Sequence, residues 1–193
     1  MKTKLCLLIL LIVGLSVQLS ANPINGLLER IDKGASKKFV IEFKKGADDF
    51  FELDQKGTKV VVRGNNYVNI ATGINWYLKY YAGIQLSWNG MQAKLPQVLP
   101  PVPRKERHET SLSLRYDFNY CTYSYTMAFW DWERWEKEID WMALHGINLP
   151  LAAVGQECIW FNMLQKLGYS KDEINRFIAG PAFLAWWAMN NLE

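Results

Sequence analysis

Residues 112–154 read LSLRYDFNYCTYSYTMAFWDWERWEKEIDWMALHGINLPLAAV, and this stretch decides the fold. Its first part, 112–118, alternates apolar and polar side chains, which is typical of a β-strand with one buried face. Asp131 then precedes an amphipathic helix pattern over 132–145. The last part, 147–154, is an almost continuous apolar run, typical of a strand buried on both faces. The stretch therefore predicts a strand, a helix and a second strand.

The same rhythm continues to the end of the chain. Gln156 to Leu167 has the pattern of another helix, and Ser170-Lys-Asp-Glu173 is a capping box that opens the next one. Gly180-Pro181 then restarts a helix that runs through Ala188, with proline in its first turn. Two βα units in succession predict a parallel sheet with right-handed crossovers.

Two architectures begin in this way, a doubly wound sheet and a (β/α)8 barrel. The polar face of the first strand, Arg115, Asp117 and Asn119, favours the barrel, whose interior those side chains would line. A closed barrel needs about 200 residues or more, and only 86 residues follow Arg107. We therefore expect an incomplete barrel, which makes the chain a truncated gene product or a fragment of a longer protein.

The region before this stretch is a small mixed α/β domain, which we place at residues 22–98. Helices are expected at Gly26–Ile31 and Tyr67–Tyr81. Strands are expected at Phe39–Phe43, Phe50–Leu53, Val60–Val62 and Ile84–Trp88, the middle pair being joined by a hairpin turn at Gln55-Lys56-Gly57.

The segment 99–111 is expected to be a linker, because it holds three prolines and a charged cluster. The start of the barrel then occupies 112–193.

Residues 1–21 have the features of a secretory signal peptide. A basic start, Met1-Lys-Thr-Lys4, precedes the apolar run Leu5–Val13, and small or polar residues lead to Ala21. A membrane anchor is the alternative, but the apolar stretch approaches the ~18 residues of a span only if its polar end is counted. We expect an exported protein with no stable membrane anchor after signal cleavage.

The composition excludes several classes of protein. Half of the 193 residues are hydrophobic and 21% are charged, which excludes disorder as the main state. The formal charge falls from +3 to +1 when Lys2 and Lys4 are removed, so nothing favours a nucleic acid as partner. Seven of the nine tryptophans lie between Trp130 and Trp187, which makes that half unusually aromatic.

Polar side chains follow the two predicted strands, at the edge where α/β proteins hold their ligands. Asn119 and Gln156 each offer a donor and an acceptor for sugar hydroxyls or an amide. Glu157 has two interpretations of equal weight: a general acid or base, or an acid that complements the dipole of a helix.

The cysteines and histidines give little support to other chemistry. Cys121 has no base beside it in the sequence, and Cys158 is expected in the core, so both are interpreted as free thiols. The two histidines, His108 and His145, are too few and too far apart for a zinc site, and no glycine-rich phosphate loop occurs. We therefore expect no metal and no cofactor.

Trp186 and Trp187 follow the Gly-Pro corner, and one of them must face away if the other is buried. A tryptophan at the mouth of a sheet suits the apolar face of a pyranose ring.

Four segments carry a resemblance to a known family: 114–125 (LRYDFNYCTYSY), 129–149 (FWDWERWEKEIDWMALHGINL), 155–157 (GQE) and 180–186 (GPAFLAW). Together they closely resemble the α-N-acetylglucosaminidase family, glycoside hydrolase family 89. The preceding region is similar to the small amino-terminal domain of that family, through 64–67 (GNNY) and 73–78 (GINWYL).

The resemblance implies a fold and an activity. The fold class is α/β: a small α/β amino-terminal domain followed by the first two βα units of a (β/α)8 TIM barrel. In full-length members of the family an all-helical domain follows the barrel. The activity is removal of terminal α-linked N-acetylglucosamine from glycans, with retention and without metal. The full-length enzyme could form a homo-oligomer. Such an enzyme would be periplasmic or secreted in a bacterium, and lysosomal in an animal.

The resemblance also implies site residues. Asn119, Cys121 and Trp186 match positions that line the sugar pocket of the family, and we extend the substrate-binding set to Gln156 and Glu157. The two catalytic glutamates of the family lie on later barrel strands, so this chain is expected to hold neither of them and to be inactive alone.

A second hypothesis is a noncatalytic, secreted carbohydrate-binding remnant of such an enzyme. A reading frame that continues after Glu193 with six more βα units would favour the enzyme, whereas a stop codon there would favour the remnant. A third, another α/β exo-glycosidase, is weakened by the specificity of the matched segments.

Overall fold

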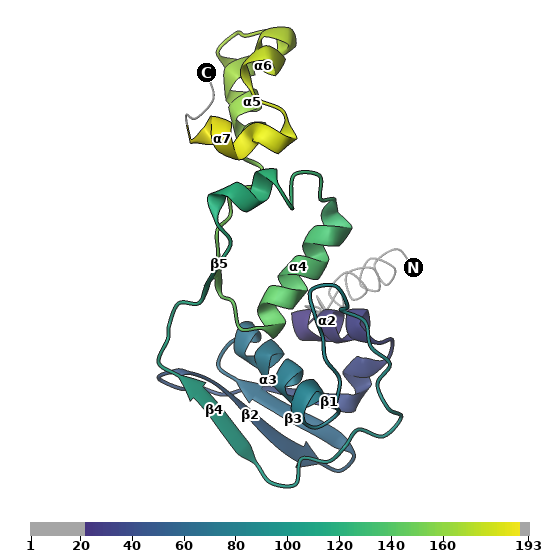
Figure 1. Ribbon diagram of the computed structural model, residues 1–193. Coiled ribbons are helices and arrows are strands. Elements are labelled where there is room, and N and C mark those ends of the chain that lie inside the picture. The colour runs from purple at the N-terminus through teal and green to yellow at the C-terminus, as the bar shows by residue number, and fades with distance from the viewer. Residues whose placement is uncertain (1–21, 190–193) are drawn as a thin grey trace, which may run out of the picture.

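The computed structural model describes residues 22–189 (Figure 1). The predicted signal peptide, 1–21, lies outside the described residues. The helices, including 3-10 helices marked η, are α2 (Pro23–Ile31), η1 (Ala35–Lys38), α3 (Tyr67–Tyr80), η2 (Tyr120–Ser124), α4 (Trp132–Leu144), α5 (Gln156–Lys166), α6 (Lys171–Phe177), η3 (Pro181–Phe183) and α7 (Leu184–Ala188). The strands are β1 (Phe39–Phe43), β2 (Asp49–Lys56), β3 (Lys59–Gly64), β4 (Glu106–Thr110), β5 (Tyr116–Asp117) and β6 (Leu149–Pro150). Within 22–189, no helix combines the length and the apolar character that a membrane crossing requires.

The small domain is a four-stranded sheet with helices packed on it (Figure 1). The strand order is β1-β3-β2-β4, with β1 parallel to β3 and the other pairs antiparallel. The predicted hairpin joins β2 to β3, and Gly57 supplies the positive φ of 60° that its turn requires. The α/β prediction for this region is confirmed.

Helix α3 supplies much of the core of the small domain. Its N-cap is Asn66, whose side chain accepts a hydrogen bond from the backbone N–H of Asn69 at 2.8 Å. Ile70, Ile74 and Leu78 recur at helical spacing and are fully buried against the sheet. The amphipathic pattern of the sequence is thus realised by packing on one sheet face.

The predicted linker, 99–111, is wrong in its second half, because Glu106–Thr110 forms β4 and pairs with β2. Its first half is also packed: Leu99 and Val102 are 4% and 5% exposed. The Tyr77 hydroxyl donates to the carbonyl of Pro100 at 2.6 Å. An edge strand needs only one partner, which here lies more than fifty residues earlier, and local composition carries no sign of it.

The predicted strand at Ile84–Trp88 is also wrong. Ser87 and Gly90 exchange two backbone hydrogen bonds, of 3.0 and 2.9 Å, so that Trp88 stands at the tip of a tight turn. Leu86, which is 1% exposed, anchors this turn in the core.

The second half of the chain contains the predicted βα units. Strands β5 and β6 are parallel, with Tyr116 opposite Leu149, and α4 is the crossover between them. The strands are only two residues long, shorter than the predicted 112–118 and 147–154, and Leu149 is 42% exposed. The helices follow the prediction closely: Asp131 caps α4, and the capping box of Ser170 and Glu173 opens α6.

Arg115 does not line an interior. Its Nη2 lies 2.8 Å from Oδ2 of Asp49 in β2, and its other guanidinium nitrogens donate to the carbonyls of Leu112 and Gly146. The prediction of an inward polar face is therefore wrong for this residue, because a carboxylate on the small domain offers a partly buried partner.

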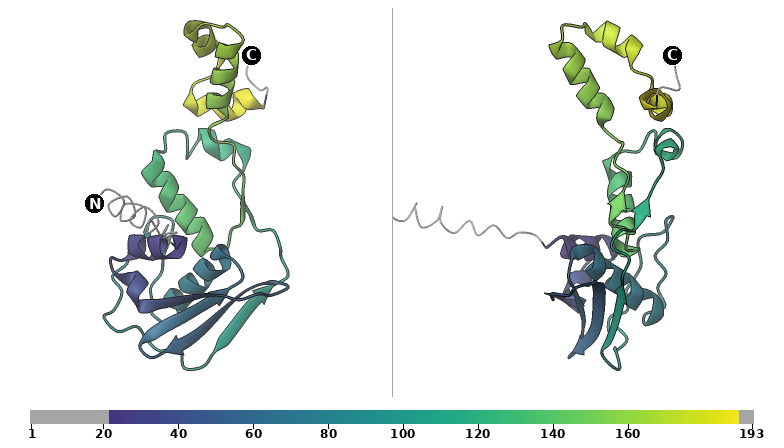
Figure 2. Two further views of the ribbon diagram at one scale, coloured as in Figure 1. Left: turned by 180° about the vertical axis from the view of Figure 1, so that it is seen from behind. Right: turned by 90° about the vertical axis from the view of Figure 1, so that its left-hand side faces the viewer.

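The small domain also contacts α4 directly. Arg30 of α2 holds the buried Asp140 through two hydrogen bonds of 2.6 and 2.7 Å. The Asn75 side chain of α3 donates to the carbonyl of Leu144 at 3.1 Å. The two further views show α5, α6 and α7 at the end of the molecule remote from the sheet (Figure 2).

Candidate functional site

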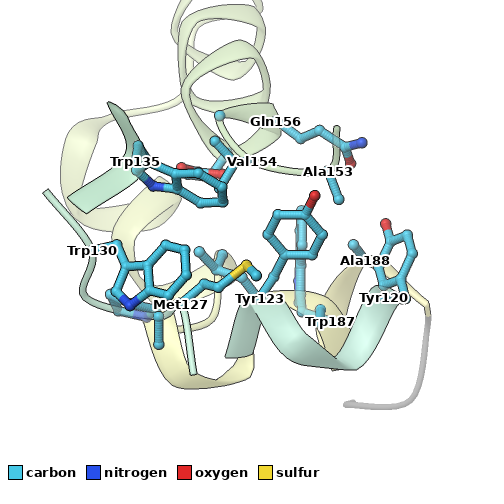
Figure 3. A pocket seen from close by; sticks show the side chains of 16 residues that line it. Tyr120, Tyr123, Met127, Trp130, Trp135, Ala153, Val154, Gln156, Trp187 and Ala188 are labelled. Carbon is cyan, nitrogen blue, oxygen red and sulfur yellow. The ribbon is translucent and has the colours of Figure 1, made fainter. Parts of the chain in front are cut away.

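A cavity of 340 Å³ lies where β5 and β6 end, between η2, α5 and α7 (Figure 3). Its walls are mostly aromatic and apolar. The lining residues are Tyr120, Tyr123, Met127, Ala128, Trp130, Trp135, Ala153, Val154, Gly155, Gln156, Glu157, Pro181, Leu184, Ala185, Trp187 and Ala188. In this view Trp130 and Trp135 lie together on one side, and Tyr120 and Trp187 lie toward the other.

Short-range hydrogen bonds shape the wall that follows β5. The Asn119 side chain accepts hydrogen bonds from the backbone N–H groups of Cys121 and Thr122, at 3.0 and 3.2 Å, and so begins η2. Ser124, also in η2, accepts from the backbone N–H of Ala185 at 2.9 Å. This buried hydrogen bond joins the segment after the first strand to α7, although the two residues are 61 positions apart in the sequence.

The aromatic side chains of the cavity contact one another. The ring centroids of Trp130 and Trp135 are 5.0 Å apart in an edge-to-face arrangement. Tyr123 stacks on Trp135 at 6.1 Å, and its hydroxyl donates to the carbonyl of Leu151. Trp187 contacts Trp160 edge to face at 5.6 Å. Such mutual contacts hold the rings in fixed orientations.

The structure places the predicted site residues in two groups. Gln156 and Glu157 line the cavity, from the first turn of α5. Asn119, Cys121 and Trp186 are not among its lining residues: Asn119 is exposed as the cap of η2, and Cys121 is the half-buried residue two positions later. The half-buried Trp186 faces Tyr125, with ring centroids 5.7 Å apart.

The cavity has few ionisable groups. Glu157 is the one carboxylate among its lining residues. Burial raises the pKa of Tyr123, so its phenol stays a neutral hydrogen-bond donor at physiological pH. Across residues 22–189, no three His, Cys, Asp or Glu side chains gather as metal ligands. The arrangement is suited to binding an amphipathic ring with polar edges.

Both cysteines of the described region are free, as predicted from the sequence. Cys158, expected in the core, is instead exposed on α5. Its neighbours on that helix are exposed as well, including Ile159 at 70%.

Sequence reasoning missed the aromatic residues that make most of the cavity wall: Tyr120, Tyr123, Trp130, Trp135 and Trp187. The dense aromatic stretch 120–135 directly after the first strand was the available signal. Of the adjacent pair after the Gly-Pro corner, Trp187 rather than Trp186 reaches this cavity.

Comparisons with known families match both halves of the chain. The model of the α-N-acetylglucosaminidase amino-terminal domain matches residues 22–101, and that of the α-N-acetylglucosaminidase TIM-barrel domain matches residues 115–193. The second match identifies the parallel β5–β6 unit as the start of a barrel, in agreement with the sequence prediction.

Individual relatives agree with the family models. Human α-N-acetylglucosaminidase is 45% identical over 162 residues, which is 84% of this chain and 22% of that protein. Structures of a family 89 glycoside hydrolase from Clostridium perfringens, in complex with 2-acetamido-1,2-dideoxynojirmycin or with its substrate GlcNAc-α-1,4-galactose, superpose with a TM-score of 0.81 at 40% identity. The match to these structures spans 87% of this chain but 20% of the Clostridium protein. This chain therefore spans about a fifth of the length of its relatives.

Proposed function

Because the chain belongs to the α-N-acetylglucosaminidase family, glycoside hydrolase family 89, we propose that it forms the small domain and the first part of the catalytic barrel of an exo-acting glycosidase. This enzyme removes terminal α-linked N-acetylglucosamine from glycans. The observation that carries the proposal is the 45% identity to the human enzyme across 84% of the chain, which includes both the small domain and the strand ends around the cavity.

In this function the cavity and its rim form one wall of the sugar site. A pyranose has an apolar face that stacks on aromatic rings and hydroxyls that need donors and acceptors at its edge. Trp187 and Tyr120 offer the rings, and Gln156 offers an amide beside them. We place Asn119, Cys121 and Trp186 at the rim of the same site. Asn119 caps η2, Cys121 lies in η2 and Trp186 lies in α7, and the hydrogen bond between Ser124 and Ala185 joins these two helices.

The catalytic carboxylates belong elsewhere in the enzyme. A retaining glycosidase needs two carboxyl groups about 5–5.5 Å apart, one as nucleophile and one as acid and base. The cavity supplies a single carboxylate, Glu157. We therefore assign both catalytic glutamates to polypeptide beyond residue 193 and give Glu157 a binding role. With its leader, the enzyme would act outside the cytoplasm, in the periplasm or medium of a bacterium or the lysosome of an animal.

A chimera tests the proposal. The 162 matched residues of the human relative are replaced by those of this chain, and hydrolysis of an aryl α-N-acetylglucosaminide is measured. We expect the chimera to be active, and Asn119→Ala or Trp186→Ala to lower its kcat/KM about tenfold or more, the effect of losing one good polar or stacking contact. Trp132→Ala is the matched control, since Trp132 is 68% exposed and does not line the cavity.

Two results would contradict the proposal. A folded chimera without activity would remove the assignment to this reaction, in favour of a noncatalytic carbohydrate-binding protein. Turnover by the purified 193-residue chain alone would show that the catalytic pair lies within it.

A further inference from the structure

Trp88 belongs to the small domain but contacts the helix that leads away from the cavity. It stands at the tip of the turn closed by Ser87 and Gly90, and its indole Nε1–H donates to Oε2 of Glu138 in α4 at 2.6 Å. Glu138 is 2% exposed, so this hydrogen bond is shielded from water. Neither Trp88 nor Glu138 lines the cavity.

Arg134 shares the same carboxylate. Its Nη2 lies 2.9 Å from Oε2 of Glu138, one turn along α4. The guanidinium also lies over two indole rings, 3.9 Å from the centroid of Trp130 and 4.8 Å from that of Trp88. The two rings are themselves tilted against each other, with centroids 6.2 Å apart, and a planar cation that lies against both is attracted by each ring.

Trp130 connects this cluster to the cavity. It lines the cavity itself and contacts a second lining residue, Trp135, at 5.0 Å (Figure 3). A continuous set of contacts therefore runs from Trp88 through Glu138 and Arg134 to the wall of the cavity. The buried carboxylate of Glu138 binds both the indole N–H of Trp88 and the guanidinium of Arg134. Trp88 also lies beside Trp130 itself, with ring centroids 6.2 Å apart.

We propose that Trp88 is a positioning residue for the cavity: it orients Arg134 through their shared carboxylate, and Arg134 in turn fixes the ring of Trp130. The small domain thereby sets the shape of the carbohydrate site from outside it. The part of this inference that concerns sugar rests on the proposed function, whereas the orientation of Trp130 does not.

Trp88→Phe is the primary test in the full chain, because it keeps an aromatic ring under Arg134 and removes the indole N–H. The indole N–H signal of Trp130 is followed by NMR while N-acetyl-D-glucosamine is added as the probe. We expect this signal to shift in the variant before any sugar is present, and the Kd for the sugar to rise about three- to tenfold, the effect of losing one hydrogen bond of ordinary strength. Arg134→Lys, which keeps the charge but not the planar stack, should give the same two changes.

The double variant provides a further measurement. If both residues act through one set of contacts, Trp88→Phe combined with Arg134→Lys should raise the Kd little more than either change alone. Trp76→Phe is the matched control, since Trp76 packs on Phe51 and His108 within the small domain, and it should leave the Trp130 signal in place.

An unchanged Trp130 signal in Trp88→Phe would overturn the inference, as would additive effects of the two changes on the Kd. Absence of sugar binding by the unaltered chain would leave the proposed function to the chimera test, because this chain supplies only one wall of the site. The signal of Trp130 would still decide the positioning role in that case.

Discussion

Glu52 is a carboxylate surrounded by three cations on the sheet of the small domain. Its side chain is 3% exposed and lies 2.7 Å from Lys44 Nζ, 2.9 Å from Lys105 Nζ and 3.1 Å from Arg107 Nη1. Its neighbours in β2, Phe51 and Leu53, belong to the core beneath the helices, so alternation directs Glu52 to the other sheet face. Glu52→Gln removes the charge and leaves the three cations without their common partner.

The size of the effect follows from the pKa. Burial alone would raise the pKa of Glu52, but hydrogen bonds from Lys44, Lys105 and Arg107 outweigh it and lower the pKa to about 2 from the ordinary 4.5. A shift of that size corresponds to about 3 kcal/mol of folding free energy. The side chains of the three cations are 36–49% exposed and partly screened by solvent. We therefore expect Glu52→Gln to lower the free energy of unfolding at pH 7 by about 2 kcal/mol.

The sign of the pH dependence follows as well. Because the folded-state pKa is depressed, the stabilisation is fully present above about pH 4.5, the unfolded value, and is lost as the pH falls through about 2. Urea unfolding of the unaltered chain and of Glu52→Gln between pH 7 and pH 3 should therefore give a gap in unfolding free energy that narrows below pH 4.5. Glu42→Gln is the control, an exposed carboxylate paired with Arg63, and should cost less than about 1 kcal/mol. A gap that is absent at pH 7, or constant down to pH 3, would refute the reasoning.

Three further predictions concern packing, junction and capping. A Cβ on Gly73 would lie 2.9 Å from Cγ1 of Val62 and 3.1 Å from Cβ of Phe51, so Gly73→Ala should lower the unfolding free energy by about 1–3 kcal/mol in urea; an unchanged midpoint would mean that α3 can lift from the sheet without cost. Arg115→Met leaves Asp49, whose side chain is 18% exposed, without its guanidinium, and should cost about 2–3 kcal/mol. Much of that loss should be recovered on adding Asp49→Asn, and a double variant no more stable than Arg115→Met would contradict the ion-pair argument. Ser170→Ala removes the capping box of α6 and should cost about 1 kcal/mol, seen as faster hydrogen exchange of the α6 amides; unchanged exchange would show that packing alone holds the helix.

The sequence predicted best what depends on near neighbours. Helix α4 begins after Asp131 because that side chain accepts a hydrogen bond from the backbone N–H of Arg134, three residues on. The capping box of Ser170 spans the same distance. Across one turn of α4, an ion pair joins Arg134 to Glu138. The i,i+4 spacing permits this pair, but the sequence gives no sign that Trp88 of the small domain donates to the same carboxylate.

The errors lie where a remote partner decides the structure. Strand β4 exists because β2 offers it an edge, and the proline-rich composition before it predicts only a break. A remote partner also separates two neighbouring tryptophans at the cavity. Trp187, which lines the cavity, contacts Trp160 of α5 and Phe177 of α6, whereas Trp186 does not line it. Those contacts come from residues that no local pattern connects to the Gly-Pro corner.

The apolar alternation of 112–116 explains why the barrel could be predicted although little of it is formed. Leu112, Leu114 and Tyr116 share one face and are 65%, 67% and 57% exposed, whereas such an alternating pattern ordinarily marks a buried face. Helix α5 has no buried residue although Ile159 and Trp160 lie on it. The matched relatives are about five times as long as the match. Under the proposed function, these exposed apolar side chains would pack against later parts of the barrel. Under the proposed function the cavity is one wall of a larger sugar site. Its aromatic rings contact one another and, through Trp130 and Trp88, the small domain.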